Sequence, residues 1–421
     1  MAGDGSASQK TRSIGRGDWS IDEGVTYLNH GSFGPPPRIV QDVRNEWTRR
    51  LNSNPMDFYL RQFDTALQTA AHRLGQLVGA SDRDVVFVDN ATVAMNVVAQ
   101  SLPLGPGDEV LLNDHEYGAV FRIWRVVCER TGAKVVSPTL GRSSQQGEMP
   151  FRFEQRSDVC EPILAAITPQ TKLIVISHIT SPTAIIFPVE EVCKAARQRG
   201  IPICIDGPHA IAMHDVNLRT LDCDFYCASL HKWLSAPFGA GFLYVHRNWH
   251  QKVTPHLTSW GRNLAGHAPR WQDHLNWLGT RDPAPFLSVP AAIDFLEGFG
   301  IDAFRRQTHE LAQYARQRLE SILGQSATIP DSNDWYGSMI AIPLPPDSPK
   351  KARPNAIHPL QQTLWDRHQI EVPVTECHGH HYLRVSCHLY NTTAEIDVLC
   401  EAVKQYLSRE IERPADRPRG E

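Results

Sequence analysis

The sequence has no long apolar run, although hydrophobic residues make up 41% of its 421 residues. Residues 1–20 contain no apolar segment of the kind found in signal peptides, and no later run is long enough to span a bilayer. Charge of one sign is not clustered either, because 42 basic and 46 acidic residues are scattered along the chain. These absences exclude a nucleic-acid or anionic-membrane footprint and predict a cytoplasmic protein that binds a small polar molecule.

Cysteine pairs and repeated metal-ligand spacings are also missing. The nine cysteines are odd in number and irregularly spaced, which predicts reduced thiols and no disulfide framework. The cluster Cys377–His381 could ligate zinc, but no paired ligand spacing accompanies it elsewhere in the sequence. We therefore expect no metal site.

The common glycine-rich nucleotide signatures are absent as well. No P-loop sequence is present, and the glycine cluster at 238–242 precedes a strand instead of a helix. A nicotinamide-dependent dehydrogenase needs a glycine-rich turn from a strand into a helix. Its absence makes that class of enzyme a poor candidate.

Between residues 60 and 290 the sequence alternates short apolar runs with helical patterns. Apolar positions recur at helical spacing in 119–130 and 189–199. The pattern predicts an α/β domain with a mostly parallel sheet covered by helices. The runs typical of buried strands are 85–88, 109–112, 173–176, 203–205, 225–228 and 242–245.

After about residue 290 the pattern changes. A long helical stretch at 291–322 precedes strand-like segments near 338–342, 370–374 and 382–386, and a loop rich in Pro and Lys at 343–354 interrupts them. Both chain ends are poor in groups that could pack. The predicted division is disordered ends at 1–20 and 409–421, a large domain at 60–290, and a small α+β domain at 291–408 joined by the segment 21–59.

Two predicted strand ends carry side chains of opposite chemistry. The strand at 203–205 ends in Asp206, and the strand at 225–228 is followed by Lys232. Ligands of open α/β sheets collect at such strand ends, and pyridoxal phosphate requires an anion at its ring nitrogen and an amine at its aldehyde. Each residue alone has an ordinary explanation, a capping aspartate and a solvated lysine. Their joint occurrence predicts a pyridoxal phosphate enzyme.

A candidate phosphate site accompanies this pair. Asn90-Ala91-Thr92 opens the helical stretch 93–102, where free backbone amides and a hydroxyl attract anions. Simple N-capping explains the same residues equally well, and the two interpretations are compatible. Ser229 and His231 could also reach a phosphate; otherwise they are a strand-end hydroxyl and a packed surface imidazole.

A series of short motifs follows in a fixed order. They are Tyr27–Ser32, Asn90–Thr92, Asp114–Tyr117, Ser177–Thr183, Asp206–His209, His231–Leu234, Gly279–Asp282 and Arg384–Ser386. Each motif alone is weak, but together they resemble the class V aminotransferase family of fold type I pyridoxal phosphate enzymes. The resemblance is strongest to the isopenicillin N epimerase-like branch, and it covers nearly everything from residue 27 to about 391.

The resemblance implies a fold and a set of catalytic groups. The fold would be that of this family, a seven-stranded, mostly parallel sheet in a large domain beside a smaller α+β domain. Lys232 would bind the aldehyde of pyridoxal 5'-phosphate covalently, and Asp206 would pair with the pyridine nitrogen. His209 would lie near the phenolic oxygen of the ring, and Tyr117 would stack on the ring face.

The resemblance also implies the remaining cofactor contacts. Thr92, Ser229 and His231 would bind the phosphate, with Ala91 and Ser181 as further cofactor-binding residues. In this family the loop that contains Thr280 reaches the phosphate of the partner subunit, so the active unit would be a homodimer.

The substrate side of the site is implied in the same way. Arg384 resembles the arginine that clamps the α-carboxylate of an amino acid, a role suited to its planar, bidentate fork. Asn29 and His30 would line the substrate side of the pocket.

These residues leave the reaction class open. With Lys232 as the base that removes the α-proton, epimerisation, transamination and β-elimination share one first step. The nearest branch favours an epimerase or racemase, and the alternative is a carbon–sulfur lyase or an aminotransferase. A cofactor-binding protein without turnover is disfavoured because Lys232, Asp206 and Arg384 occur together.

Two departures from related enzymes bear on this choice. Ser181 stands where cysteine desulfurases usually carry asparagine, and their loop with a reactive cysteine has no match, because Cys377 lies too close to Arg384. Desulfuration therefore ranks low. Epimerisation would need an acid on the face opposite the lysine, and the candidates are Tyr59, His30 and His178.

Overall fold

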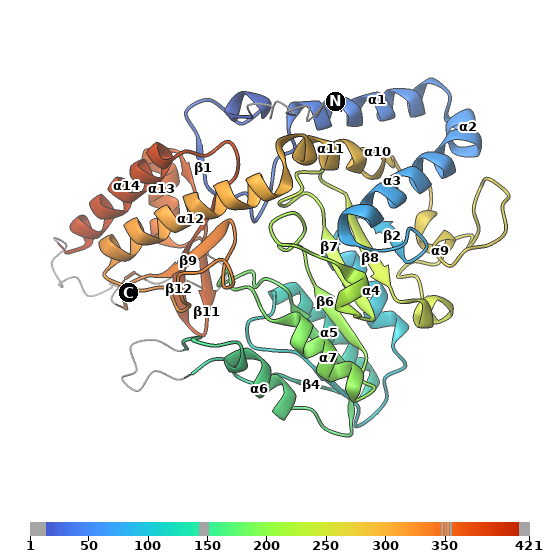
Figure 1. The fold of residues 1–421 in the computed structure, drawn as a ribbon, viewed down its shortest axis with the longest axis horizontal. Helices are drawn as coiled ribbons and strands as arrows, with labels where there is room; N and C mark the ends of the chain where they lie inside the picture. The colour runs from blue at the N-terminus through green and yellow to red at the C-terminus, as the bar shows by residue number, and fades with distance from the viewer. Residues whose placement is uncertain are drawn as a thin grey trace, which may run out of the picture.

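Seven strands form the central sheet of the computed structural model, which describes residues 14–142, 151–346 and 356–411 and positions 348, 349, 351 and 353 (Figure 1). Neighbouring strands are parallel except for the pairs β2–β8 and β8–β7. The predicted mostly parallel sheet is therefore confirmed. In spatial order the strands are β2 (Val85–Val88), β8 (Gly241–Val245), β7 (Phe225–Ser229), β6 (Ile203–Asp206), β5 (Thr171–Ser177), β3 (Glu109–Leu111) and β4 (Lys134–Val136).

The strand β4 has no counterpart among the predicted strands. It lies at the edge of the sheet and pairs only with β3, and none of its three residues is buried. A half-exposed edge strand needs no long apolar run, so the pattern that identified the other strands is missing here.

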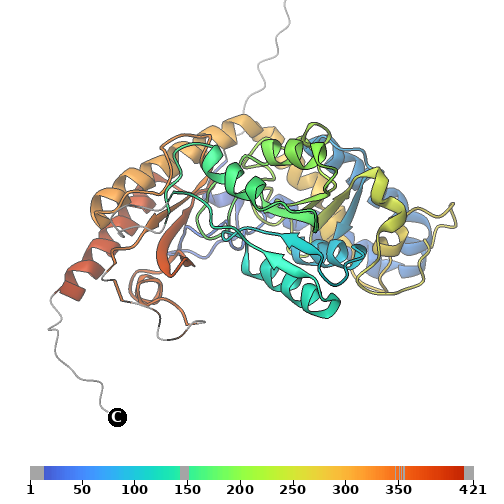
Figure 2. The ribbon, with the colours of Figure 1, turned by 90° about the horizontal axis from the view of Figure 1, so that it is seen from below.

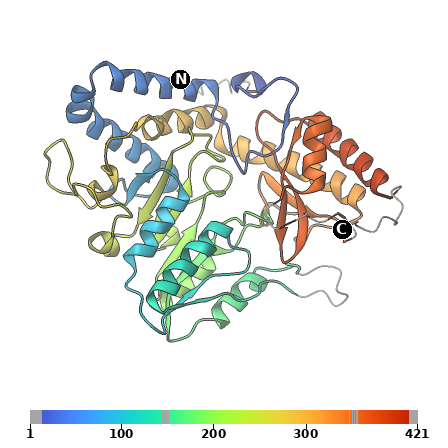
Figure 3. The same ribbon diagram turned by 180° about the vertical axis from the view of Figure 1, so that it is seen from behind.

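Helices cover both faces of this sheet. In β2, Val86 and Val88 belong to a hydrophobic cluster with α4 (Ala91–Ser101) and α5 (Gly118–Thr131), which lie together on one face (Figure 3). Val85 and Phe87 point to the opposite face and join the cluster of α3 (Phe63–Val78) and α7 (Val189–Gln198). Because side chains alternate between two covered faces, continuous apolar runs are what such strands require.

The C-terminal part contains a second sheet with three antiparallel strands. Its order is β11 (Val374–Cys377), β12 (His380–Ser386) and β9 (Met339–Pro343). The helices of this part are α12 (Ile301–Leu323), α13 (Pro359–His368) and α14 (Thr393–Ile411). Figure 2 shows this part at one end of the molecule, with the seven-stranded sheet at the other.

The helical stretch predicted over 291–322 is helical in the structure, but it is divided into two helices. α11 (Val289–Phe299) and α12 are separated by Gly300, whose φ of 99° no L side chain adopts readily. The segment Ala284–Phe299, which ends with α11, and α12 are bent by 75°, and α12 crosses toward the C-terminal part (Figure 1). Among the described helices none is by itself long and apolar enough to cross a membrane; this bent pair passes the length and composition criteria only when taken together.

The N-terminal segment contacts both parts. Helix α1 (Arg38–Ser53) packs along α10 (Ala284–Leu287) and α11, and β1 (Thr26–Tyr27) pairs in parallel with β10 (Ile370–Glu371). The other short elements are η1 (Arg16–Asp18), α2 (Pro55–Asp57), η2 (Phe58–Gln62), α6 (Ser157–Ala165), α8 (Leu218–Leu221), η3 (Arg247–Lys252) and α9 (Asp273–Asn276).

The ordered chain begins earlier than expected. Trp19, within the segment predicted to be disordered, is 1% exposed and packs edge-on against Phe295 and Tyr390. At the other end α14 continues to Ile411. Residues 1–13 and 412–421 lie outside the described residues, and the predicted domain boundaries near 60 and 290 stay predictions.

Candidate active site

Three neighbouring strands end in polar side chains at one edge of the sheet. Ser177 ends β5, Asp206 ends β6 and Ser229 ends β7, and Ser177 lies directly beside Asp206 in the parallel register. The carboxyl ends of parallel strands face the same side. This edge therefore collects a carboxylate between two hydroxyls.

Asp206 is almost completely buried. Burial raises the pKa of its carboxyl group above the usual value, and the nearby Lys232 ammonium acts in the opposite direction. The following residue must be glycine, because a Cβ at Gly207 would lie 2.1 Å from the phenol ring of Tyr226. A buried carboxylate in this position favours a cationic partner.

Lys232 lies in the turn after β7. Protein atoms surround its amine on most sides although the side chain keeps some accessibility, and burial together with the Arg384 cation lowers the pKa of the amine. Its Nζ lies 2.8 Å from Nε2 of His209. A lowered pKa favours the neutral, nucleophilic amine.

The tautomer of His209 follows from its second partner. The indole Nε1 of Trp233 lies 3.4 Å from Nδ1 of His209, and because an indole can only donate, Nδ1 accepts. Burial holds the pKa of His209 well below its usual value, so the ring is neutral and has its proton on Nε2, facing the amine of Lys232. The imidazole is thus locked in one orientation beside the lysine.

The first turn of α4 lies beside the end of β7. The amide of Ala91 donates to Oγ of Ser229 at 3.0 Å, and Oδ1 of Asn90 accepts from the amide of Val93 at 3.0 Å, which is an N-cap. Thr92 is exposed at the start of the helix. N-capping is therefore present, and it leaves the amide and the hydroxyl of Thr92 to face an anion.

His231 contributes an unused nitrogen near this turn. Its Nδ1 is buried without a hydrogen-bond partner, and burial, followed by the charge of Lys232, lowers the pKa of the ring to about 4. The ring contacts Phe238 at a centroid distance of 5.4 Å. A buried polar atom without a partner is costly, so a ligand that bonds this nitrogen would relieve the cost.

The glycine cluster at 238–242 has a packing role that the sequence did not reveal. A Cβ at Gly241 would lie 2.7 Å from the carbonyl oxygen of Ala228 and 2.7 Å from Cα of Asn90. Glycine is required here because the start of α4 and the end of β7 approach the backbone of β8 closely. The cluster therefore shapes the anion site without contributing a side chain.

Arg384 on β12 approaches the sheet edge from the C-terminal part. Its Nη1 donates to the carbonyl of Ser181 at 2.6 Å and lies 3.3 Å from the Ser181 hydroxyl, and its Nη2 donates to Oγ of Ser32 at 2.5 Å. It is 3% exposed, its Nε has no partner, and burial lowers its pKa to about 10. A buried guanidinium without a carboxylate is what an anionic substrate group can pair with.

Asn29 and His30 differ in what they can contact. Oδ1 of Asn29 is buried without a partner, so it is available to a ligand. His30 is fully buried, with Nδ1 2.9 Å from the hydroxyl of Tyr390 and Nε2 2.9 Å from the carbonyl of Lys232, and it stacks on His388. Both of its nitrogens are occupied, so it supports the Lys232 backbone instead of lining an open pocket.

Tyr117 and Thr280 are, like Thr92, accessible members of the predicted set. Tyr117 precedes α5, is 49% exposed, and lies near enough to Arg384 that its phenol favours the cationic guanidinium. Thr280 is exposed after Gly279, whose φ is 113°. No contact in the described residues brings Thr280 to Lys232 of the same chain.

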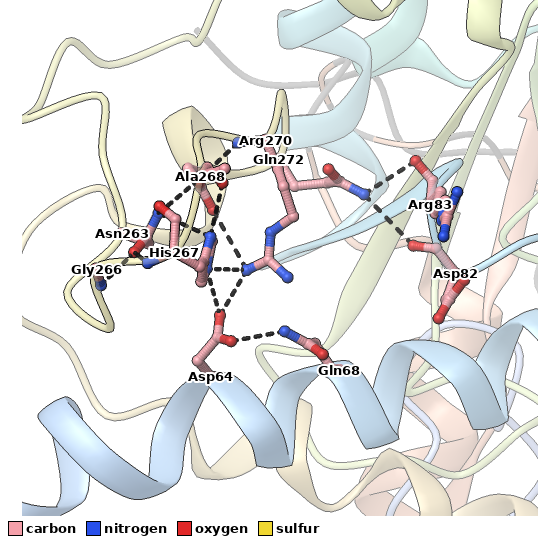
Figure 4. Close-up of polar contacts among 11 residues, drawn as sticks. Asp64, Gln68, Asp82, Arg83, Asn263, Gly266, His267, Ala268, Arg270 and Gln272 are labelled. Atoms are coloured by element: carbon pink, nitrogen blue, oxygen red, sulfur yellow. Dashed lines mark hydrogen bonds and ion pairs between the residues drawn. The ribbon is translucent and has the colours of Figure 1, made fainter.

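The segment that leads to Thr280 is anchored to the large sheet. Asp64 on α3 faces His267 and Arg270 at 3.1 and 2.5 Å, and the side chain of Asn263 bonds the backbone of His267 (Figure 4). Beyond it, Arg281 pairs with Asp89 at 2.7 Å. These contacts hold the loop 277–280 at the surface.

Glu116 is a buried acid that the sequence reasoning missed. One carboxylate oxygen accepts from the amide of Ser177 at 2.8 Å, and the other lies 2.8 Å from the Ser177 hydroxyl. These hydrogen bonds favour ionisation, but burial and the charge of Asp206 outweigh them and raise the pKa to about 8. The one feature of the sequence that pointed to Glu116 is its place in the motif Asp114–Tyr117.

The three residues proposed as a second acid are engaged elsewhere. Tyr59 donates to the carbonyl of Arg281 at 2.6 Å, and Nδ1 of His178 lies 2.9 Å from the hydroxyl of Tyr226. His30, the third, is held beneath Lys232 as described above. None of these contacts places an acid opposite the amine of Lys232, so that assignment stays a prediction.

Comparisons with known proteins agree with this geometry. The family model for class-V aminotransferases matches residues 27–399. Isopenicillin N epimerases of Amycolatopsis lactamdurans and Streptomyces clavuligerus are 37% and 34% identical, each over 92% of this chain and 96% of its own length. The cysteine desulfurase CsdA from Escherichia coli has the same fold, with a TM-score of 0.76 at 21% identity over 94% of this chain and 98% of that chain. The chain belongs to the class V aminotransferase family.

Proposed function

We propose that this protein is a pyridoxal 5'-phosphate-dependent epimerase that acts on the α-carbon of an amino acid or of a small molecule that contains one. The observation that carries the proposal is the convergence of Lys232, Asp206 and Arg384 at the carboxyl edge of the sheet. The similarity to two isopenicillin N epimerases along almost the whole chain favours epimerisation over other reactions of such a site.

The polar groups at this edge fit the cofactor. Asp206 is a buried carboxylate that favours a cation, as a protonated pyridine nitrogen is. The first turn of α4, Ser229 and the unpartnered Nδ1 of His231 suit a phosphate. The lowered pKa of Lys232 suits attack on an aldehyde. Among these groups, Nδ1 of His231 is a buried atom to which the chain supplies no hydrogen-bond partner.

The chemistry divides between the cofactor and the chain. When bound, pyridoxal phosphate withdraws electrons from the substrate α-carbon. Arg384 holds the substrate carboxylate through its paired N–H groups, which fixes the direction of the C–H bond. The amine of Lys232, kept neutral by burial, accepts the α-proton, and His209 holds it in place.

The free thiols bear on the alternative reactions. All nine cysteines are unpaired and buried, and burial raises the pKa of Cys377 to about 12, which suppresses its thiolate. A desulfurase that accepts sulfur on a cysteine would need an accessible thiolate. A carbon–sulfur lyase or an aminotransferase needs none, so these remain the second candidate function.

The proposal includes a homodimer and a cytoplasmic location. Thr280 is exposed on an anchored loop, which suits contact with the phosphate of a partner subunit. Light scattering after size-exclusion chromatography should give twice the mass of one chain. Thr280→Ala should weaken cofactor binding without changing that mass. Nine unpaired thiols are typical of a reducing compartment.

The test is an epimerisation assay of the holoenzyme in deuterated water. Free amino acids and isopenicillin N are incubated separately with the holoenzyme. The products are separated by chiral chromatography and analysed by mass spectrometry. We expect one substrate to yield both epimers, with one deuterium at the α-carbon and no 2-oxo acid.

Parallel assays for pyruvate, sulfide and 2-oxo acids distinguish the alternatives. Pyruvate with sulfide would identify a carbon–sulfur lyase, and a 2-oxo acid formed in step with cofactor amination would identify an aminotransferase. Either product without a second epimer would overturn the epimerase proposal.

A further inference from the structure

A cluster of metal-ligand side chains lies where the two parts of the molecule meet. His115 precedes α5 in the large part, whereas Cys377 and His378 lie at the tip of the β11–β12 hairpin in the C-terminal part. One donor atom from each of the three lies within 4.8 Å of the other two. The set is separate from the Lys232 site in its side chains, although His115 is close in sequence to Tyr117.

A carboxylate, Asp114, lies beside this cluster. Sγ of Cys377 lies 3.8 Å from Nδ1 of His115, and Nε2 of His378 lies 3.1 Å from Oδ2 of Asp114. The second carboxylate oxygen of Asp114 is 3.9 Å from Nε2 of His115. One thiolate and two imidazoles are donors that zinc prefers.

The hairpin turn presents His378 to this cluster. His378 and Gly379 have φ angles of 51° and 74°, which is the backbone of a tight type I′ turn. A non-glycine residue adopts this region at some cost. The turn places Cys377 at the end of one strand and His378 immediately beyond it, so that two donors project from adjacent positions.

An ion pair alone does not account for the cluster. The Asp114 carboxylate raises the pKa of His378, and it also accepts from the amide of Leu140, so these two side chains satisfy one another without a metal. His115, however, is completely buried and its Nε2 has no hydrogen-bond partner. The other ring nitrogen, Nδ1, lies 3.1 Å from the Thr183 hydroxyl and 3.8 Å from the Cys377 thiol, so Nε2 is the nitrogen left to bind a cation.

We propose that His115, Cys377 and His378 bind a zinc ion, with the Asp114 carboxylate beside His378. Binding releases the thiol proton of Cys377 to solvent, and the imidazoles coordinate in their neutral form. Three protein ligands leave the fourth position of a tetrahedral site to water. The ion joins the segment that carries Tyr117 to the hairpin that carries Arg384. It thereby fixes the distance between the cofactor side of the site, at Tyr117, and the side that binds the substrate carboxylate, at Arg384.

The first experiment counts zinc in the holoenzyme. The protein is saturated with zinc sulfate, dialysed against metal-free buffer and analysed by mass spectrometry of the element. We expect about one zinc per chain in the wild type, and less than about a fifth of that in His378→Ala and Cys377→Ala, since each loses one of three protein ligands. His380→Ala is the matched control, a histidine of the same hairpin outside the cluster, and should keep its zinc.

Folding is controlled separately. His378 is exposed, so its removal leaves the core unchanged, and circular dichroism and thermal unfolding without zinc should match the wild type. Zinc should raise the unfolding temperature of the wild type and of His380→Ala but not of His378→Ala.

A cobalt spectrum identifies the thiolate ligand. Cobalt bound through sulfur gives a charge-transfer band in the near ultraviolet, and this band should be missing in Cys377→Ala. The proposal is overturned if the wild type retains no zinc, if the four proteins retain equal amounts, or if bound cobalt shows no thiolate band. None of these readouts requires turnover, so they are independent of the proposed epimerase activity.

Discussion

Nζ of Lys232 lies 2.8 Å from Nε2 of His209, and the ring of His209 is turned by the indole of Trp233 so that its proton faces the amine. The relationship explains how a buried lysine is kept both neutral and oriented. Burial and the charge of Arg384 lower the pKa of the amine, and the neutral imidazole adds no competing charge.

Covalent capture of pyridoxal phosphate by the apoenzyme should depend on pH through Lys232. Because the amine pKa is lowered to about 7, the capture rate should rise up to about that pH and then level off. Rapid-mixing absorbance at a series of pH values measures this rate. A rate that keeps rising toward pH 10, as for a solvated lysine, would contradict the assignment.

Replacement of Lys232 by alanine should abolish epimerisation, since both the covalent anchor and the base are lost. The phosphate contacts from α4 and Ser229 remain, so the variant should still bind the cofactor non-covalently. Borohydride treatment followed by peptide mass analysis should find the pyridoxyl group on the peptide that contains Lys232 in the wild type only. A label on another lysine would remove Lys232 from its role.

Replacement of Arg384 by leucine should weaken amino-acid binding more than it lowers the turnover rate of the bound amino acid. A charge-assisted pair contributes roughly 1.5–3 kcal/mol, which corresponds to a loss of about 10- to 100-fold in affinity. Arg384→Lys keeps the charge without the fork and should lose less. Titration of the holoenzyme spectrum with amino acid gives the dissociation constant, and an unchanged value in Arg384→Leu would exclude the predicted contact.

Glu116→Gln should change how stability depends on pH. The folded pKa of about 8 exceeds the ordinary value of 4.5, so this group contributes stability that is fully present below pH 4.5 and is lost as pH rises through 8. The glutamine cannot titrate, so the variant should not lose this stability. Over that pH range, its free energy of unfolding should rise relative to that of the wild type by on the order of a few kcal/mol. Urea unfolding at pH 5 and pH 8 measures the difference, and parallel changes in both proteins would refute it.

Two glycine-to-alanine substitutions should have opposite effects on stability. A Cβ at Gly207 would collide with the ring of Tyr226, so Gly207→Ala should destabilise by at least ~1–3 kcal/mol and move Asp206. Gly298 in α11 has open space around it, so Gly298→Ala should be neutral or stabilise by up to ~1 kcal/mol. Thermal unfolding compares the two, and a tolerated Gly207→Ala would show that the ring of Tyr226 can shift.

Much of the fold could be predicted because both faces of the sheet are covered. Six of its strands correspond to the predicted apolar runs. The helices α5 and α7 begin and end within a residue or two of the predicted positions. The strand β4 was missed because an edge strand needs no such run, and the break at Gly300 was missed because the apolar spacing continues across it. The spacing of apolar residues indicates which positions are buried, but it does not show where a helix ends and the chain changes direction.

The site divides in the same way. The sequence by itself determined that a carboxylate ends one strand and that a lysine follows the next strand along the chain, since strand ends and caps are set by residues adjacent in the chain. Only the tertiary structure decided that Ser32 and Ser181 hold Arg384 across 352 and 203 positions, and that Cys377 meets His115 across 262. Such contacts depend on how loops return and surfaces pack, and a single buried contact leaves no period in the sequence from which it could be predicted.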